Sequence, residues 1–276
     1  MKWAVGPLGF NVVLRGFDAE ATDTLDKRFG SSRFPVELRT AASLDLTIDT
    51  RPGLFWFGRD AVASDDGSWA MRHEFVAQRD RSGAWFLRTL PSTIGVEAGL
   101  RWIVSVELIA RGGLLLHGSS IALDGRSHVF VGHSGAGKST LAFRGDHDGI
   151  LCDEVSIVCG DEEGTLWCYP SPFWGLHVMP RRHTFEPLPV HSIWLLAGWE
   201  SSRTETVDDG EALLGIGARI VDIGAASGLS VQVLDRLTEL LEYAETGRMR
   251  WQLGSSLRAL LTDWVHKNDR NTHATL

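Results

Sequence analysis

A glycine-rich run of nine residues constrains this chain more than any other feature: Gly132-His133-Ser134-Gly135-Ala136-Gly137-Lys138-Ser139-Thr140. It satisfies the pattern G-x-x-x-x-G-K-[ST] over its whole length. The apolar residues Val129 to Val131 predict a strand just before it, and Thr140 to Arg144 predict a short helix after it. Glycines let successive backbone N–H groups curl around an anion, and the helix adds the positive end of its dipole. The run therefore predicts a loop that binds nucleotide phosphates.

Two side chains of this loop have distinct expected roles. Lys138 is expected to place its charge on the β and γ phosphates, and the Ser139 hydroxyl to coordinate Mg²⁺. These roles make a nucleoside triphosphate with Mg²⁺ the expected ligand. The alternative is an ordinary glycine-rich turn, because short patterns also match by chance.

A pair of acids follows in an apolar stretch. Asp153 and Glu154 lie within Gly149 to Val158, which we expect to form one strand. Buried carboxylates are costly unless they meet a charge or a metal ion, and Mg²⁺ would supply one. Asp153 is the candidate metal ligand beside Ser139, and either acid could accept the proton of an attacking hydroxyl, so the assignment of the base stays open. The alternative is an acid pair at a sheet edge that faces water.

The geometry of a strand sets a condition on this pair. Neighbouring residues on a strand point to opposite faces, so both acids can serve one site only if the strand ends or bulges there. Because Lys138 and Asp153 are close in sequence, the acids belong to the very next strand. ATPases of the transporter type place this strand much further along and need a separate signature motif. The chain has neither feature.

The third informative feature is a histidine that precedes the loop. His117 lies in Leu116-His117-Gly118-Ser119, just before a predicted two-stranded ribbon that turns at Asp124-Gly125. Alone, it would most often be a packed core histidine. Together with the loop and the acid pair, it resembles the C-terminal domain of HPr kinase/phosphorylase. The chain is more similar to the HPr kinase-related proteins, some of which phosphorylate a lasso-peptide precursor on a terminal serine.

This resemblance covers about residues 110 to 265, and it implies an α/β fold. The implied fold is a P-loop kinase domain of the phosphoenolpyruvate-carboxykinase-like type, with ATP and Mg²⁺ as cofactors. By matching position, His117 and Lys138 are implied to be active-site residues, Ser139 to bind Mg²⁺, and Asp153 or Glu154 to be the base. The implied reaction transfers the γ-phosphoryl group to a hydroxyl, most simply a serine of a peptide or protein.

The chain departs from the parent family in several places. The parent has two aspartates where this chain has Asp153-Glu154. Its downstream magnesium-binding glutamate motif and its later catalytic arginine have no counterpart that we can identify here. The resemblance therefore does not extend to the reverse, phosphorylase activity. The parent forms hexamers, so a homo-oligomer is one open state of this chain.

Two other functions remain open at this point. One is a kinase for a small molecule such as an amino acid, a sugar or another metabolite. The other is a nucleotide-dependent binding module that acts on a partner without transferring phosphate. The presence of both acids beside a complete loop argues against the second.

Two regions are expected along the chain. Residues 1–110 are predicted to be a strand-rich α+β region that ends in a bridging helix over 92–111, and residues 111–266 the P-loop domain. Residues 267–276 are predicted to be a disordered tail. In the first region we expect a helix, two apolar strands and a hairpin: Glu20 to Phe29 ending at Gly30, Leu44 to Ile48, Leu54 to Phe57, and Phe75-Val76 with Trp85 to Leu87 around Asp80 to Gly83.

Large aromatic residues gather in the first region, and we interpret them as packing residues: Trp3, Trp56, Trp69 and Trp85. The second region is expected to contain strands and two amphipathic helices beyond those already described. The strands are Leu114 to Leu123, Ser127 to Val131, Ile193 to Ala197 and Met249 to Leu253. The helices are Val231 to Ala244 and Leu257 to Val265, and Ser201 to Gly210 is expected to be a surface loop.

Weaker candidates lie after the acid pair. Pro170 to Gly175 either lines an acceptor pocket or forms a rigid proline-rich turn. Arg181 and Arg182 either contact phosphate or face solvent. Three histidines lack a metal-ligand spacing, and we interpret them as not forming a metal site: His177, His183 and His191.

The composition excludes several classes of partner. The chain has 27 Lys and Arg against 35 Asp and Glu, a formal charge of −8, which disfavours nucleic acid and anionic membranes. The apolar stretch from Ile94 to Ala110 contains too many charges to span a bilayer, and Met1 to Phe10 does not match a signal peptide. The three cysteines, Cys152, Cys159 and Cys168, lack zinc-site spacing and favour a reduced, cytoplasmic setting.

Overall fold

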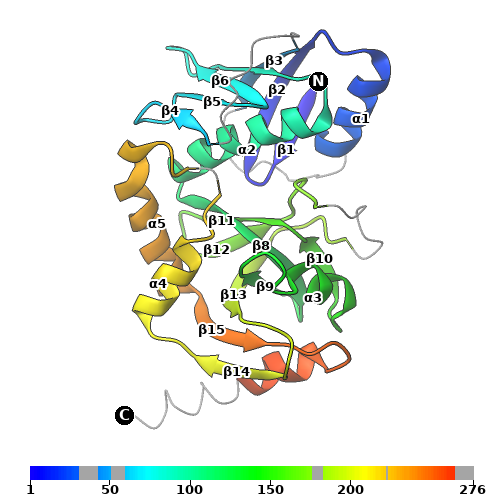
Figure 1. Ribbon diagram of the computed structural model, residues 1–276, viewed down its shortest axis with the longest axis vertical. Helices are drawn as coiled ribbons and strands as arrows, with labels where there is room; N and C mark the ends of the chain where they lie inside the picture. The colour runs from blue at the N-terminus through cyan, green and yellow to red at the C-terminus, as the bar shows by residue number, and fades with distance from the viewer. Residues whose placement is uncertain (31–42, 51–59, 176–182, 222, 265–276) are drawn as a thin grey trace.

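The chain has a mixed α/β fold with two sheets, which confirms the expected class (Figure 1). The computed structural model describes residues 1–30, 43–50, 60–175, 183–221 and 223–264. Several expectations fall outside these ranges: the strand over Leu54 to Phe57 with Trp56, the residues His177, Arg181 and Arg182, and the tail 267–276. None of the helices in the described ranges is long and apolar enough to cross a membrane.

The first sheet is built from the N-terminal residues and has the order β1-β2-β3-β7-β6-β5-β4. Its central strands β2, β3 and β7 are parallel, and the other pairs are antiparallel. The predicted strand at Leu44 and the hairpin around Asp80 to Gly83 are confirmed. The strands are β1 (Lys2–Val5), β2 (Leu8–Arg15), β3 (Leu44–Thr50), β4 (Val62–Ala63), β5 (Trp69–Arg72), β6 (Phe75–Arg79) and β7 (Trp85–Thr89).

Two predicted helices of this region are confirmed, and each has a side chain that caps its first turn. Helix α1 (Ala19–Phe29) begins after Asp18, whose carboxylate accepts from the Ala21 N–H at 2.8 Å, and it ends at Gly30. Helix α2 (Thr93–Ile109) begins after Ser92, which caps it in the same way. These caps satisfy N–H groups that have no partner within the helix.

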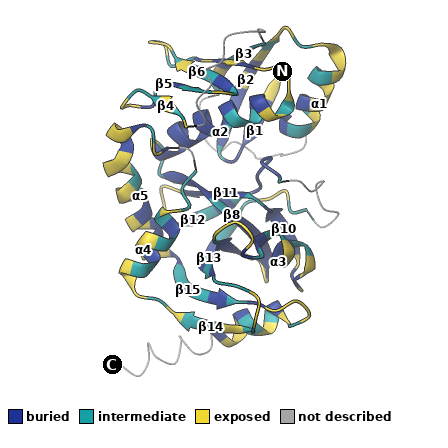
Figure 2. Ribbon diagram, viewed as in Figure 1, coloured by how far each residue is buried: buried dark blue, intermediate teal, exposed yellow. Residues whose placement is uncertain are grey.

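Helix α2 lies between the two sheets and is buried along most of its length (Figures 1 and 2). It contacts β6 and β7 of the first sheet and β8 of the second. Gly99 allows the close approach to the first sheet, because a Cβ there would lie 2.2 Å from Cδ1 of Leu87. The helix therefore packs against both sheets and belongs to the core of each.

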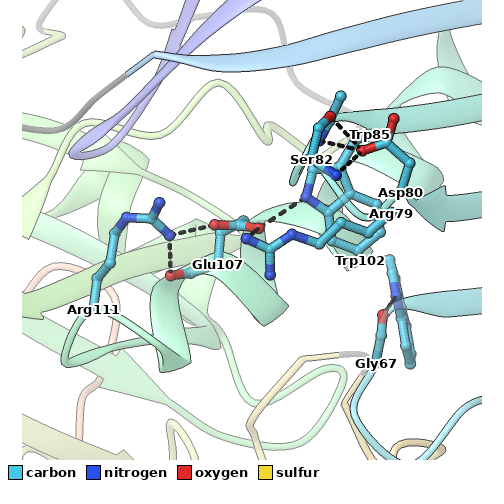
Figure 3. Close-up of polar contacts among 9 residues, drawn as sticks. Gly67, Arg79, Asp80, Ser82, Trp85, Trp102, Glu107 and Arg111 are labelled. Atoms are coloured by element: carbon cyan, nitrogen blue, oxygen red, sulfur yellow. Dashed lines mark hydrogen bonds and ion pairs between the residues drawn. The ribbon is translucent and has the colours of Figure 1, made fainter.

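A buried charge fixes α2 to the hairpin of β6 and β7 (Figure 3). The Glu107 side chain is 1% exposed, accepts from Trp85 Nε1 at 2.8 Å, and pairs with Arg79 at 3.4 Å and with Arg111. Trp85 is fully buried, as is Trp3, whose ring lies 5.1 Å from that of Phe29. The interpretation of these two tryptophans as packing residues is confirmed.

The second sheet begins at the strand after α2 and has the order β10-β8-β11-β12-β13-β15-β14. Strand β9 pairs with β8 antiparallel and with β13 parallel, so five strands, β8, β9, β13, β12 and β11, close into a ring. The strands are β8 (Gly113–Leu123), β9 (Arg126–Val131), β10 (Gly149–Cys152), β11 (Val155–Gly160), β12 (Leu166–Tyr169), β13 (Leu188–Leu196), β14 (Arg203–Thr206) and β15 (Glu245–Arg250).

The helices of this part are α3 (Lys138–Arg144), α4 (Asp209–Gly217), the 3-10 turn η1 (Ser227–Leu229), α5 (Ser230–Tyr243) and a helix over 257–264. The predicted helices after the loop and at the C-terminal end are confirmed. In α5 the buried apolar face is narrow, because Leu237 and Leu240 are buried but Leu234 is 49% exposed.

Three sequence predictions for this part are wrong. The strand expected over Gly149 to Val158 is two strands, β10 and β11. The strand expected at Met249 to Leu253 lies earlier, because Glu245 to Met249 pair with β13, and residues 251–253 leave the sheet. The expected surface loop over Ser201 to Gly210 contains β14, which pairs with β15, and the start of α4, which Asp208 caps.

Candidate nucleotide-binding site

The glycine-rich loop from Gly132 to Thr140 lies at the C-terminal end of β9, beside the parallel strand β13, and leads into α3. Gly135 and Gly137 have φ of 82° and 97°, a conformation that residues with a side chain rarely adopt. A Cβ on Gly132 would lie 2.8 Å from the Leu196 carbonyl oxygen. The structure thus uses the glycines of the motif for backbone conformation and for close packing, as the motif requires.

The rest of the loop divides into packed and accessible residues. Ala136 is buried, and its N–H donates to the His133 carbonyl oxygen at 3.1 Å, which closes a turn. His133, Ser134 and Thr140 are exposed, and Nδ1 of His133 lies 2.7 Å from the Ser134 carbonyl oxygen. The tip of the loop therefore faces solvent, where a nucleotide can reach its backbone.

Lys138 is the first residue of α3 and is only 7% exposed. Its Nζ donates to the carbonyl oxygens of Gly132 and His133 at 3.0 and 3.1 Å. Burial lowers the pKa of this ammonium below its usual value, and the positive charge of Arg219 acts in the same direction. An anion bound in the loop would offset that penalty, because it favours the charged form of the lysine.

Ser139 and Asp153 are brought together as the sequence predicts. The Ser139 hydroxyl lies 3.5 Å from the backbone carbonyl oxygen of Asp153, and Asp153 is 1% exposed. Oδ1 of Asp153 accepts from the Gly175 N–H at 3.1 Å. The Ser139 hydroxyl thus lies at the backbone of the residue whose carboxylate is the candidate metal ligand. Mg²⁺ in nucleotide sites takes one or two protein oxygens and completes its shell with phosphates and water, so this donor set fits it.

The acid pair lies at a break in the second sheet. Strand β10 ends at Cys152, β11 begins at Val155, and the pairing of β10 with β8 shifts register between Ile150 and Cys152. The condition set by strand geometry is therefore met, and the two carboxylates are not constrained to opposite faces. Asp153 is buried, so a water-facing acid pair does not describe it; the Glu154 side chain is 33% exposed.

His117 lies on β8 directly opposite Val155, next to the acid pair. Its N–H donates to the Arg219 carbonyl oxygen at 2.6 Å. Burial lowers the pKa of the imidazole, the Lys138 charge lowers it further, and Glu154 opposes both. The half-buried ring is therefore held toward its neutral form beside the loop lysine and the acids.

Two arginines that the sequence did not single out also reach this site, together with Gly175 at the end of the proline-rich segment. Arg219 follows α4, and its charge acts on both His117 and Lys138. Arg101, on α2 of the first region, lies 3.8 Å from Glu154. Gly175 contacts both acids by its backbone. None of them belongs to a motif, so only Gly175, within the proline-rich segment, carried any sequence signal.

The weaker candidates have mixed outcomes. The segment from Ser171 to Gly175 lies against the acid pair, with Phe173 and Trp174 buried. The His183 ring lies 4.9 Å from the Trp174 ring, and the His191 ring lies 5.3 Å from that of His128. Within the described ranges, no three side chains of His, Cys, Asp or Glu are grouped so that they could hold a metal ion by themselves.

The three cysteines are buried free thiols, and burial raises the pKa of Cys152 to about 11. They therefore belong to the core rather than to the site.

Comparison with known proteins adds no further assignment: no protein-family model matches the chain, and no curated protein matches its sequence.

Proposed function

We propose that this chain is an ATP- and Mg²⁺-dependent kinase that transfers the γ-phosphoryl group to a hydroxyl, most simply a serine of a peptide or protein. The proposal includes a P-loop domain of the phosphoenolpyruvate-carboxykinase-like type over the second sheet. The observation that carries it is that the Ser139 hydroxyl of the loop lies 3.5 Å from the backbone carbonyl oxygen of Asp153, which brings the acid pair next to the loop. A complete phosphate loop and two carboxylates at a strand break are the parts that phosphoryl transfer needs.

Four residues of the chain have separate proposed roles in phosphoryl transfer. Lys138 would neutralise phosphate charge, and Ser139 with Asp153 would hold Mg²⁺, which would supply further charge neutralisation. The Gly175 N–H fixes one oxygen of Asp153, which suits a metal ligand. Glu154 is the more accessible acid, and we assign to it the orientation of the acceptor hydroxyl.

The proposed step balances in atoms and electrons. The hydroxyl oxygen forms a bond to the γ-phosphorus, while the bond between that phosphorus and the β–γ bridging oxygen breaks. The electron pair leaves with ADP, and the hydroxyl proton passes to Glu154. The positive charge of Arg219 lies close enough to Lys138 to lower its pKa, and two such charges near the transferred group would stabilise the transition state. Positioning of the two substrates can lower such a barrier by about 7–11 kcal/mol.

The test uses purified protein, Mg²⁺ and γ-labelled ATP with peptides encoded by neighbouring genes, read by mass spectrometry. We expect one phosphate on a peptide serine with wild-type protein and none with Lys138→Ala. Tight ATP binding without phosphate on any peptide would contradict the peptide acceptor. A panel of amino acids and sugars then separates a small-molecule kinase from a module that binds nucleotide without transferring phosphate.

A further inference from the structure

Four charged side chains of alternating sign run from the first region to the acid pair. Arg28 on α1 lies 2.5 Å from Glu97 on α2, and Glu97 lies 2.5 Å from Arg101 on the next turn. Arg101 lies 3.8 Å from Glu154. Each inner charge is therefore flanked by two opposite charges, and the row ends at a carboxylate of the candidate site.

This row is sheltered from solvent. The Glu97 and Arg101 side chains are 12% and 18% exposed, and Arg28 is 29% exposed. Burial raises the pKa of Glu97, while the charges of Arg101 and Arg28 oppose that shift. Buried ion pairs add little net stability compared with apolar packing, so their presence points to a need for defined orientation.

The same two arginines also hold the segment that touches the acids. Arg28 donates to the Trp174 carbonyl oxygen at 3.2 Å, and the Arg101 guanidinium lies 5.4 Å from the centre of the Phe173 ring. The segment ends at Gly175, whose N–H donates to Asp153 at 3.1 Å. A displacement of Arg101 would therefore reach Glu154 directly and Asp153 through this segment.

We infer that Arg101 is a positioning residue for phosphoryl transfer: it holds Glu154 toward the phosphate loop and, with Arg28, holds the segment from Ser171 to Gly175 against Asp153. Helices of the first region thus complete the site of the second. The inference rests on the proposed kinase function for its consequence in turnover, and on the contacts alone for its consequence in structure.

The first test compares three variants of the full chain. Arg101→Met removes the charge and keeps the aliphatic stem, Arg101→Lys restores a charge, and Arg111→Met is the matched control. Arg111 lies just past the end of the same helix and pairs with Glu107, at the hairpin of the first sheet. Thermal unfolding, monitored by circular dichroism, confirms that each variant is folded before its turnover is compared with that of wild type.

Turnover is measured with the phosphate-accepting peptide, or as Mg²⁺-dependent ATP hydrolysis with water as acceptor. Because a small misplacement of a reacting group can cost about 100-fold, we expect Arg101→Met to lower kcat about 10- to 100-fold. The KM for ATP should stay within about twofold, since Lys138 and the loop bind the phosphates. Arg101→Lys should recover part of kcat, and Arg111→Met should match wild type. Equal kcat values for Arg101→Met and Arg111→Met would overturn the inference.

A double-mutant cycle then asks whether Arg101 acts through Glu154. If it does, Arg101→Met should add no further loss of kcat in a Glu154→Gln background, because coupled residues are not additive. Losses that multiply would show that Arg101 acts elsewhere and would overturn the inference.

A third readout does not need catalysis. Hydrogen exchange measured by mass spectrometry should be faster at residues 171–175 in Arg101→Met than in wild type or Arg111→Met. If wild type transfers phosphate to no acceptor, the proposed function fails, and this readout still decides whether Arg101 holds the segment. Unchanged exchange in Arg101→Met would overturn the positioning role.

Discussion

The backbone N–H of Gly175 donates a hydrogen bond of 3.1 Å to Oδ1 of Asp153. A Cβ on Gly175 would lie 2.5 Å from Oε2 of Glu154 and 3.2 Å from Oδ2 of Asp153. The backbone at Gly175 is therefore packed against both carboxylates at once. Only glycine fits this position without moving them.

Gly175→Ala should consequently displace the acid pair while the phosphate loop stays intact. We expect turnover to fall about 10- to 100-fold, because the reacting groups are misplaced, with little change in ATP affinity. Steady-state kinetics and calorimetric titration of a non-hydrolysable ATP analogue measure the two effects. Gly224→Ala is the control, because no heavy atom lies within 4 Å of a Cβ placed there. Turnover of Gly175→Ala at the wild-type rate would contradict the role of this contact.

Lys138→Ala should weaken ATP binding and abolish phosphoryl transfer, because we propose that its ammonium group neutralises the charge of the phosphates. The affinity for the ATP analogue and the turnover number provide the measurement. Lys27→Ala serves as the control, since Lys27 is 69% exposed and its pair with Asp23 contributes at most about 1 kcal/mol. The site assignment fails if Lys138→Ala keeps near-wild-type turnover.

Asp153→Asn should keep the fold and lose Mg²⁺-dependent turnover, because an amide is a weaker ligand for a hard cation than a carboxylate. The Gly175 N–H can still donate to the amide oxygen, so the backbone has no reason to move. Turnover is measured over a range of Mg²⁺ concentrations, with Asp23→Asn on the exposed side of α1 as the control. Full activity at every concentration would remove Asp153 from the mechanism.

The stability of the protein should fall as the pH is lowered from 7.5 to 5.5, in part because of His128. This side chain is 4% exposed, its Nδ1 lies 2.7 Å from the Ser192 hydroxyl, and burial lowers its pKa to about 3. The charges of His191 and Arg126 act in the same direction. The unfolded chain binds a proton below about pH 6.5 while the native ring does not, so the free energy of unfolding decreases as the pH falls.

Over this range the contribution of His128 is a loss of about 1.4 kcal/mol. Urea unfolding at pH 7.5 and pH 5.5 measures it, and His128→Asn isolates it, because an asparagine at this position does not titrate. The variant should lose less stability on acidification than wild type. Equal losses in both proteins would assign the pH dependence to other groups.

The local features of this protein follow from neighbouring residues, and its sequence alone determined them. The loop from Gly132 to Thr140 is specified by glycines at the positions of positive φ and by a helix that starts at Lys138. Helices α1 and α2 are specified by their capping residues Asp18 and Ser92. Such signals act within one or two turns of chain, so the sequence displays them directly.

The sequence also indicated the acid pair. Strand geometry then required that the strand end or bulge there if both acids are to serve one site. The sequence did not show that β10 stops at Cys152 and that β11 starts at Val155, because that break comes from pairing with β8. The sequence also did not show the position of β15. This strand begins at Glu245, where it pairs with β13, and not at Met249 as expected.

The surroundings of the site were decided by the tertiary structure alone. Arg101 lies on a helix of the first region and contacts Glu154. Arg219 follows α4, and its backbone carbonyl oxygen accepts a hydrogen bond from the backbone N–H of His117. Arginines at these positions have no local signature, because their role depends on which segments the fold places beside them. Sequence determined the glycine-rich loop with its lysine and serine, and the packing of α2 between two sheets decided which distant charges lie near the acid pair.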